Sequence, residues 1–365
     1  MMRAQERFYF DRKNYRCTIL SLAKSDGQTT SRKDTMTDTI LPARWLKYTN
    51  PAFPQAADLV AAVRRAELGT STVADRSLLT SLDFQPLENE RGNNSLFRLR
   101  QNGSDWCLKL FRQDGRSRCE REWGGLCLFA ERQLPFSPRP AYCERDSKPA
   151  TLLMEFVPGI PLGEADLTQA QLEAVIETIR TIHSITPRSS EDALWTIDWD
   201  VRPILVHMAD EVERLGQLHR EGSIADACHV AGNWLSGSEP ELLLQQTSTV
   251  FSRGDPNLAN LLWADGRLRV VDLEYCGWLD RAIDLAHIVE HIRSRGTPHE
   301  KWQWFVDQFD LTAAERCRFS AAQRRMALYW LLRACAQPDT IHGLDTDNPV
   351  ELLLQRTSLV CQEKP

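Results

Sequence analysis

The segment SRGDPNLANLLWADGRLRVVDLEYCG, residues 252–277, constrains the fold more than any other part of this chain. Asp265 and Gly266 lie between two apolar runs, and a two-residue Asp-Gly connection between such runs predicts a β-hairpin with a primed turn. Counting outward from that turn places Asn260 almost opposite Asp272, and directly opposed residues have Cβ atoms about 5 Å apart. An amide oxygen and a carboxylate at that separation can bind one cation. Oxygen-only ligands suit Mg²⁺, which takes the rest of its shell from water and substrate phosphates.

A further acidic residue, Asp255, precedes the hairpin in a stretch that Gly254 and Pro256 keep out of a helix. A carboxylate at this place can accept the proton of a nucleophilic hydroxyl and orient that hydroxyl toward a γ-phosphate. The segment therefore predicts a catalytic base, Asp255, and two metal ligands, Asn260 and Asp272. The alternative interpretation is that these side chains hydrogen-bond the backbone of the turns, as Asp and Asn ordinarily do. Spacing alone leaves both interpretations open.

Hydrophobic periodicity divides the chain into three parts. Residues 1–40, which are rich in Arg, Lys, Ser, Thr and Asp, predict a disordered extension. Residues 41–157 predict a nucleotide-binding lobe, in which an accessory helix precedes the strands of a small β-sheet. Residues 158–365 predict a larger helical lobe for catalysis and substrate binding, with the hairpin as its only clear strand pair. The predicted fold class is α+β, with a small antiparallel sheet lobe on a mostly helical lobe.

Local signals predict the individual elements. Asn102 and Gly103 predict a hairpin turn between the strands NSLFRLR and SDWCLKLF. Thr168 and Gln171 form a capping box that predicts the start of a helix. Apolar residues at helical spacing predict further helices within residues 54–68, 117–133, 203–219, 281–294, 299–309 and 313–335.

Composition excludes several classes of protein. The chain has 365 residues, of which 42% are apolar, enough for a large core and two lobes. Its net charge of −6 argues against nucleic-acid binding and fits a neutral or cationic substrate. No apolar run reaches the ~18 residues that span a bilayer, so we expect a cytoplasmic protein without a membrane partner. The ten cysteines lack C-x-x-C pairs, which predicts reduced thiols rather than zinc ligands. The oligomeric state stays open.

The motifs around the hairpin resemble those of the aminoglycoside phosphotransferase and choline kinase family. Arg253-Gly254-Asp255 followed by Asn260 is similar to the family's H-G-D-x-x-x-x-N loop. Asp272-Leu273-Glu274 is similar to its D-F-E strand end, and EYCGWLDRAIDLAHIVEH to a run in choline and ethanolamine kinases. The resemblance covers roughly residues 84–335. It implies a bilobal protein-kinase-like fold and Mg²⁺-dependent phosphorylation, by ATP or GTP, of a hydroxyl on an amino alcohol, aminoglycoside or sugar.

The resemblance also assigns roles to residues. It implies that Asp255 is the base, that Asn260 and Asp272 bind Mg²⁺, and that Glu274 assists the metal or faces the substrate. Asp284, in the family's D-L-A element, is implied to hold the catalytic loop. Arg253 replaces the family's histidine, and because Arg cannot act as a neutral acceptor, the loop must be held differently here.

Lys109 lies in the middle of an apolar strand, where alternation places Cys107, Lys109 and Phe111 on one face that can line a nucleotide site. Taken alone, a strand lysine is more often an edge residue that extends to solvent. The resemblance implies instead that Lys109 contacts the nucleotide phosphates and pairs with a helix glutamate. We predict Glu122 as that partner, with Glu120 as the alternative.

Two segments of the first lobe predict further nucleotide contacts. The backbone of Gly92, Asn93, Asn94 and Ser95 can approach phosphates, although an ordinary hairpin turn is an equally good interpretation. The adenine edge is expected to bond the backbone of the strand end at Glu155, Phe156 and Val157.

Aromatic and acidic residues in the second lobe predict the acceptor site. Trp199 lies between Asp198 and Asp200, and aromatic faces beside carboxylates bind amines by cation–π and charge attraction. Trp278 and Asp280, which follow the predicted metal strand, can extend such a site toward a cationic acceptor. For each tryptophan taken individually, however, packing between helices is the favoured interpretation. For the whole chain, the alternative function is a non-catalytic nucleotide-binding protein with a kinase-like fold.

Overall fold

The computed structural model describes residues 41–362, apart from residues 42, 47, 49, 51–54, 68, 88–93, 102, 113–116, 164, 187–200 and 338–347. The predicted extension at residues 1–40 lies outside the described residues. So do six of the predicted site and turn residues, namely Gly92, Asn93, Asn102, Asp198, Trp199 and Asp200.

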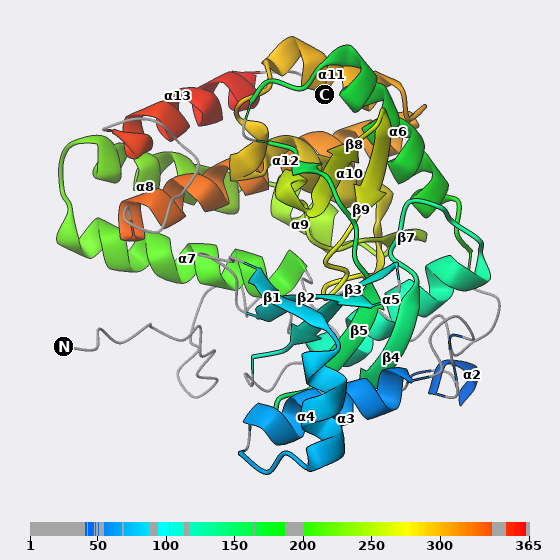
Figure 1. Ribbon diagram of the computed structural model, residues 1–365. Helices are drawn as coiled ribbons and strands as arrows, with labels where there is room; N and C mark the ends of the chain where they lie inside the picture. Colours follow the sequence, from blue (N-terminus) through cyan, green and yellow to red (C-terminus); the bar gives the residue numbers. More distant parts are fainter. Residues whose placement is uncertain are drawn as a thin grey trace.

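A five-stranded antiparallel sheet with the strand order β1-β2-β3-β5-β4 forms the first lobe, which lies below the helical lobe in Figure 1. Its elements are α2 (Ala43–Leu46), α3 (Ala56–Glu67), α4 (Val73–Thr80), β1 (Asp83–Leu87), β2 (Ser95–Gln101), β3 (Ser104–Leu110), α5 (Arg118–Glu131), β4 (Pro140–Glu144) and β5 (Thr151–Glu155).

The two faces of this sheet pack against different helices. Leu108 and Leu153 lie in a core cluster with Leu59 and Val63 of α3, whereas Cys107 and Leu152 join the main core with α5. Because side chains alternate along a strand, Lys109 shares the face of Cys107 and points toward α5. The small sheet with one helix on its inner face confirms the predicted fold class for this lobe.

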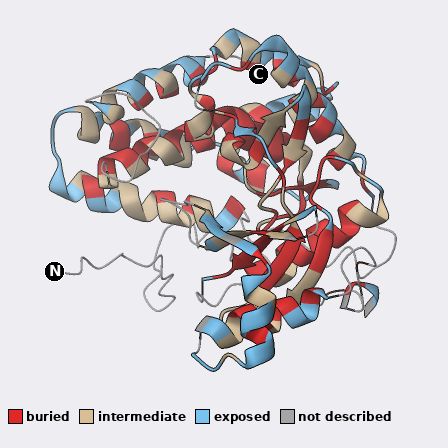
Figure 2. Ribbon diagram, in the orientation of Figure 1, coloured by how far each residue is buried: buried red, intermediate tan, exposed pale blue. Residues whose placement is uncertain are grey.

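The second lobe is mostly helical, as predicted, and begins with a short strand that leads into α6. Its elements are β6 (Ile160–Pro161), α6 (Gln169–His183), α7 (Val201–Leu218), α8 (Ser223–Leu235), α9 (Glu239–Leu244), β7 (Thr249–Ser252), η2 (Leu258–Asn260), β8 (Leu261–Ala264), β9 (Arg267–Val270), β10 (Gly277–Asp280), α10 (Arg281–Glu290), η3 (Ile292–Ser294), α11 (His299–Asp307), α12 (Ala313–Ala336) and α13 (Pro349–Gln362). Figure 2 shows that buried residues concentrate in α10, α12 and the strands between the lobes. None of the described helices combines the length and apolarity needed to cross a bilayer.

The structure extends the predictions in this lobe and corrects one of them. The sequence patterns missed α8, α9 and α13, and also the antiparallel pairing of β7 with β10, the strands on either side of the segment that carries Asp255. The single helix predicted over residues 281–294 is wrong at its end, because the helix stops at Glu290. His291 adopts extended backbone, and its Nδ1 accepts the Arg293 N–H at 3.2 Å, which starts a separate turn of η3.

The hairpin of β8 and β9 has the predicted primed turn. Asp265 and Gly266 both have positive φ, at 50° and 71°, as a type I′ turn requires. The strands pair Leu261 with Val270, and the backbone N–H of the next residue, Val271, donates to the Asn260 carbonyl at 3.0 Å. Asp272 therefore lies one residue beyond the position directly opposite Asn260.

Candidate active site

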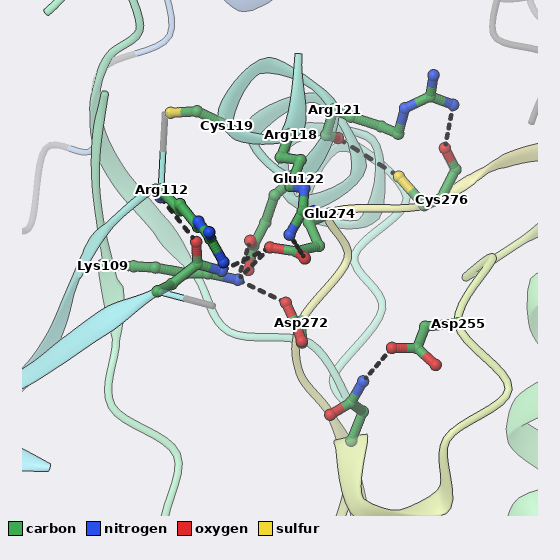
Figure 3. Close-up of polar contacts among 12 residues, drawn as sticks. Lys109, Arg112, Arg118, Cys119, Arg121, Glu122, Asp255, Asp272, Glu274 and Cys276 are labelled. Atoms are coloured by element: carbon green, nitrogen blue, oxygen red, sulfur yellow. Dashed lines mark hydrogen bonds and ion pairs between the residues drawn. The ribbon is translucent and has the colours of Figure 1, made fainter. Parts of the chain in front are cut away.

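Lys109 lies at the centre of a cluster of three carboxylates between the lobes. Its Nζ is 2.6 Å from Glu122 Oε2, 2.5 Å from Asp272 Oδ1 and 3.3 Å from Glu274 Oε2. Figure 3 shows these side chains pointing toward one another from β3, from α5 and from the segment that follows β9. Glu120, the alternative partner, lies on another side of α5 and is 3.7 Å from Arg145. The structure thus places Glu122 against Lys109.

Burial and charge act in opposite directions on this cluster. Burial alone would lower the pKa of Lys109, but the nearby carboxylates, Asp272 first, outweigh it and hold that pKa well above its usual value. For Glu122, burial is the largest cause and raises the pKa to about 7, against the opposing effect of Lys109. The lysine therefore stays charged at neutral pH, whereas the pKa of Glu122 lies close to neutral pH.

Glu274 is held by two residues besides Lys109. Arg118 Nη1 donates to its Oε1 at 2.9 Å, and Asn94 Nδ2 donates to its Oε2 at 2.7 Å. Asn94 also accepts the Arg112 backbone N–H through Oδ1 at 3.1 Å, so its side chain links the ends of β2 and β3 to the segment that follows β9. Sequence analysis missed Arg118, although its place four residues before Glu122 puts the two on one helix face.

Asp255 lies beyond Asp272 on the same side of the cluster (Figure 3). Its Oδ1 accepts the Asn257 backbone N–H at 2.9 Å, and its Oδ2 accepts from Asn260 Nδ2 at 2.9 Å. Burial, followed by the charge of Asp272, raises the pKa of Asp255 to about 6, although Arg253 and the Asn257 N–H act in the opposite direction. A carboxylate with this pKa is ionised at neutral pH and still basic enough to accept a proton.

A buried chain of hydrogen bonds holds the loop that carries Asp255. His183 Nε2 donates to Asp284 Oδ2 at 2.7 Å, and Ser252 Oγ donates to Asp284 Oδ1 at 2.6 Å. The Gly254 N–H in turn donates to Ser252 Oγ at 2.9 Å. Gly254 has a φ of 76°, and a Cβ there would lie 1.9 Å from the Tyr275 carbonyl oxygen, so only glycine fits.

Arg253 is buried at the place of the family's histidine and holds the loop from within. Its Nη1 donates to the Asn257 carbonyl at 3.1 Å, while Nε and Nη2 have no hydrogen-bond partner among the described residues. The guanidinium is the main positive charge that lowers the pKa of Asp255. Arg253 thus supports the loop through a donated hydrogen bond and a charge.

Replacing Arg253 by His is expected to lower kcat by about tenfold, because the loop loses its hydrogen bond to the Asn257 carbonyl. A tenfold change in rate corresponds to ~1.4 kcal/mol in activation free energy. The kinetic pKa of Asp255 is expected to rise, since the positive charge that opposes its protonation is removed. A pH–rate profile measures both effects. Arg253→Lys is the control that keeps the charge, and an unchanged profile for Arg253→His would contradict this role.

The residues present fit a divalent cation. Carboxylate oxygens of Glu122, Asp272 and Glu274 lie within 4.8 Å of one another. Asp272, with φ of 61°, has its side chain about one-third exposed, at 32%, while the other two are buried. Because Asn260 Nδ2 donates to Asp255, the amide oxygen Oδ1 is the atom left for a cation. This oxygen-only donor set suits Mg²⁺.

The strand end predicted to contact adenine has, among the described residues, one residue whose backbone N–H donates to no other backbone group. The Glu155 N–H donates to the Arg139 carbonyl at 2.9 Å, and the Phe156 N–H donates to the Asp105 carbonyl at 3.0 Å. Within the described part of the chain, the backbone of Val157 takes part in no such hydrogen bond. Val157 is therefore the residue of the three whose N–H remains for a nucleotide base.

The predicted acceptor contacts are brought together only in part. Trp278 is buried on β10, with its ring centroid 5.3 Å from that of Phe251, so the structure favours the packing interpretation and does not support a substrate contact. Glu274 is also buried, although it stays beside Lys109. Asp198, Trp199 and Asp200 lie outside the described residues.

Known proteins and a protein family resemble this chain in sequence and fold. The family model APH, the phosphotransferase enzyme family, matches residues 83–327. The fold is similar to an ethanolamine kinase of Plasmodium vivax (13% identity, 79% of this chain and 84% of that chain covered, TM-score 0.54). It is also similar to a choline/ethanolamine kinase family protein from Mesorhizobium loti (16% identity, 83% of this chain and 95% of that chain covered, TM-score 0.54). A third similar structure is the ADP-bound aminoglycoside phosphotransferase APH(2'')-Ib (15% identity, 79% of this chain and 94% of that chain covered, TM-score 0.52).

A search among curated proteins gave no significant match. The structural likenesses, at these identities, establish a common fold. The family model spans more than half of the chain, from β1 to α12, and includes every residue of the lysine cluster and of the loop that carries Asp255. The protein therefore belongs to the phosphotransferase enzyme family.

Proposed function

We propose that this protein transfers the γ-phosphoryl group of ATP to a hydroxyl of a small molecule, with Mg²⁺ as cofactor. The observation that carries the proposal is the convergence of Lys109, Asp272 and Asp255, which come from separate parts of the chain. A cation that can contact phosphate oxygens, an oxygen-ligand set and a basic carboxylate are the groups that phosphoryl transfer requires.

Each residue has one task in this proposal. Lys109, held by Glu122, binds phosphate oxygens of the nucleotide. Asn260 and Asp272 would hold Mg²⁺, with Glu274 beside them, and the ion when bound neutralises phosphate charge. Asp255 accepts the proton of the acceptor hydroxyl and orients its oxygen toward the γ-phosphorus. Catalysis then rests on positioning and charge rather than on a covalent intermediate.

The acceptor we propose is an amino alcohol, an aminoglycoside or a sugar. Family membership supports a small-molecule hydroxyl, and similar structures include an ethanolamine kinase and an aminoglycoside phosphotransferase. Asp198, Trp199 and Asp200 remain the proposed contacts for a cationic acceptor, whereas Trp278 is set aside because it is buried against Phe251.

A panel of acceptors tests this proposal. ADP or GDP release is measured with ATP or GTP, in Mg²⁺ and in excess chelator, for choline, ethanolamine, aminoglycosides, sugars and amino-acid alcohols. We expect acceptor-dependent release that stops when the metal is removed. Nucleotide binding without release for any acceptor would favour the non-catalytic alternative and contradict the proposal.

Activity is expected to fall at acid pH through the protonation of Asp255. Its pKa is raised to about 6, and only the ionised form can accept a proton, so kcat/KM should fall about tenfold per pH unit below that value and level off above it. A pH–rate profile between about pH 5 and pH 8 measures this, with the unfolding midpoint followed in parallel to separate titration from denaturation. A flat profile over that range would count against Asp255 as the base.

A further inference from the structure

Two cysteines face each other beside the lysine cluster. The Sγ atoms of Cys119 and Cys143 lie 3.6 Å apart. Cys119 belongs to the first turn of α5, and Cys143 to β4, which is an edge strand of the sheet. Cys119 is buried, whereas Cys143 is partly exposed. Cys119 also lies 3.8 Å from the Thr151 carbonyl oxygen, and the charges of Glu122 and Lys109 act on its thiol. The sequence patterns did not connect the two cysteines because they are 24 positions apart.

We propose that Cys119 and Cys143 form a reversible disulfide when the protein meets a hydroperoxide. Sulfurs in a disulfide are about 2.05 Å apart, so the two atoms must approach by about 1.5 Å. β4 can supply this movement because it pairs on one side only, with β5, and its register is irregular between Pro140 and Tyr142. The disulfide therefore needs only a local shift of β4 toward Cys119.

The order of reaction follows from exposure. The contact with Cys143 and burial raise the pKa of Cys119, so the partly exposed Cys143 reacts first. Its thiolate attacks hydrogen peroxide, the O–O bond breaks, and a sulfenic acid and water form. The sulfur of Cys119 then attacks that sulfenic sulfur, the S–S bond forms, and a second water leaves. Two thiols lose two electrons and two protons, and one peroxide becomes two waters.

The crosslink would join β4 to the helix turn that serves the lysine cluster. Arg118, next to Cys119, contacts Glu274 at 2.9 Å, and Glu122, one turn further, contacts Lys109 at 2.6 Å. Figure 3 shows Cys119, Arg118 and Glu122 on this one helix. A disulfide here closes a loop of the chain and restricts the unfolded state, so the oxidised protein is expected to be more stable than the reduced one.

Peptide mapping of the whole protein tests the proposal. The protein is treated with hydrogen peroxide, remaining thiols are alkylated, and the digest is analysed by mass spectrometry. We expect a linked peptide pair containing Cys119 and Cys143, which disappears when a thiol reductant precedes alkylation. The melting temperature of the oxidised protein should lie about 5–10 °C above that of the reduced protein. Cys143→Ser should lose this shift, and Cys317→Ser, which removes an exposed thiol, should keep it.

Two results would overturn the proposal. One is a linked pair that contains Cys127, which also interacts electrostatically with Cys143, in place of Cys119. The other is oxidation confined to the exposed Cys317 and Cys361. Neither readout depends on catalysis, so the proposed phosphotransferase function and this disulfide can fail independently.

Discussion

Replacement of Asp255 by Asn is expected to lower kcat by about 10²- to 10⁴-fold, the range typical of a lost general base. Asn has nearly the same size as Asp and keeps an oxygen that can accept the Asn257 N–H, which Asp255 now accepts at 2.9 Å. Its neutral amide, however, cannot take the proton of the acceptor hydroxyl. Nucleotide affinity should change far less than kcat, because Lys109 and Asp272 keep their contact with each other.

Two measurements separate these effects. Steady-state ADP release gives kcat, and calorimetric titration with a non-hydrolysable ATP analogue gives nucleotide affinity. Asp265→Asn is the matched control, because Asp265 is exposed at the tip of the hairpin and Asn tolerates its positive φ. We expect wild-type turnover for that control. Full turnover by Asp255→Asn on the best acceptor would show that the base lies elsewhere.

Replacement of Lys109 by Met is expected to have a large effect on both catalysis and stability. The variant loses the cation that contacts phosphate oxygens, and kcat/KM for ATP should fall by about 10²-fold or more. It also leaves the buried Glu122 without its positive partner, whereas Glu274 keeps its ion pair with Arg118. Removing one member of a buried ion pair costs about 3–5 kcal/mol in the free energy of unfolding. Chemical denaturation at pH 8 measures this loss.

The stability loss in Lys109→Met should depend on pH. Glu122 already has a folded-state pKa of about 7, above the 4.5 of an unperturbed Glu, and removal of Lys109 raises it further. Below the pKa of the unfolded state, the carboxyl group is protonated in both states and its raised pKa costs no stability. As the pH rises from there through the folded-state pKa, the unfolded state loses the proton first, so the free energy of unfolding falls. The variant should therefore approach wild-type stability as the pH falls toward 5.

Two further variants of the chain act as controls for Lys109→Met. Adding Glu122→Gln to it removes one unpaired buried charge and should restore part of the stability at pH 8. Lys301→Met removes a lysine from an exposed pair with Asp166 and should change stability little. Equal effects of Lys109→Met and Lys301→Met would contradict the role of the buried cluster.

The parts of the fold that could be predicted were those set by local chemistry. Asp265 and Gly266 specify a primed turn because both must adopt positive φ, and that turn fixes the register of β8 and β9. Thr168 and Gln171 specify the start of α6 in the same way, through reciprocal capping hydrogen bonds. These interactions join residues that are close in the sequence, so a local sequence pattern is enough to predict them.

Contacts between distant segments were out of reach. Arg118 and Glu274 are 156 positions apart, and no local pattern connects a helix arginine to a residue that follows a hairpin. The sequence left two interpretations of Trp278 open for the same reason. Beside acidic residues it suggested an amine-binding site, but the pairing of β10 with β7 places it against Phe251 in the core. That pairing depends on the arrangement of the whole lobe.

Transfer of label from [γ-³²P]ATP to the best acceptor of the panel tests the central claim most directly. Wild-type protein, Asp255→Asn and Lys109→Met are compared at equal concentration, with Mg²⁺ and with chelator. We predict labelled acceptor and equimolar ADP from the wild-type protein with Mg²⁺, and a loss of about 10²-fold or more in both variants. Label transfer at an unchanged rate in both variants would contradict the claim that Lys109 and Asp255 belong to one phosphotransferase site.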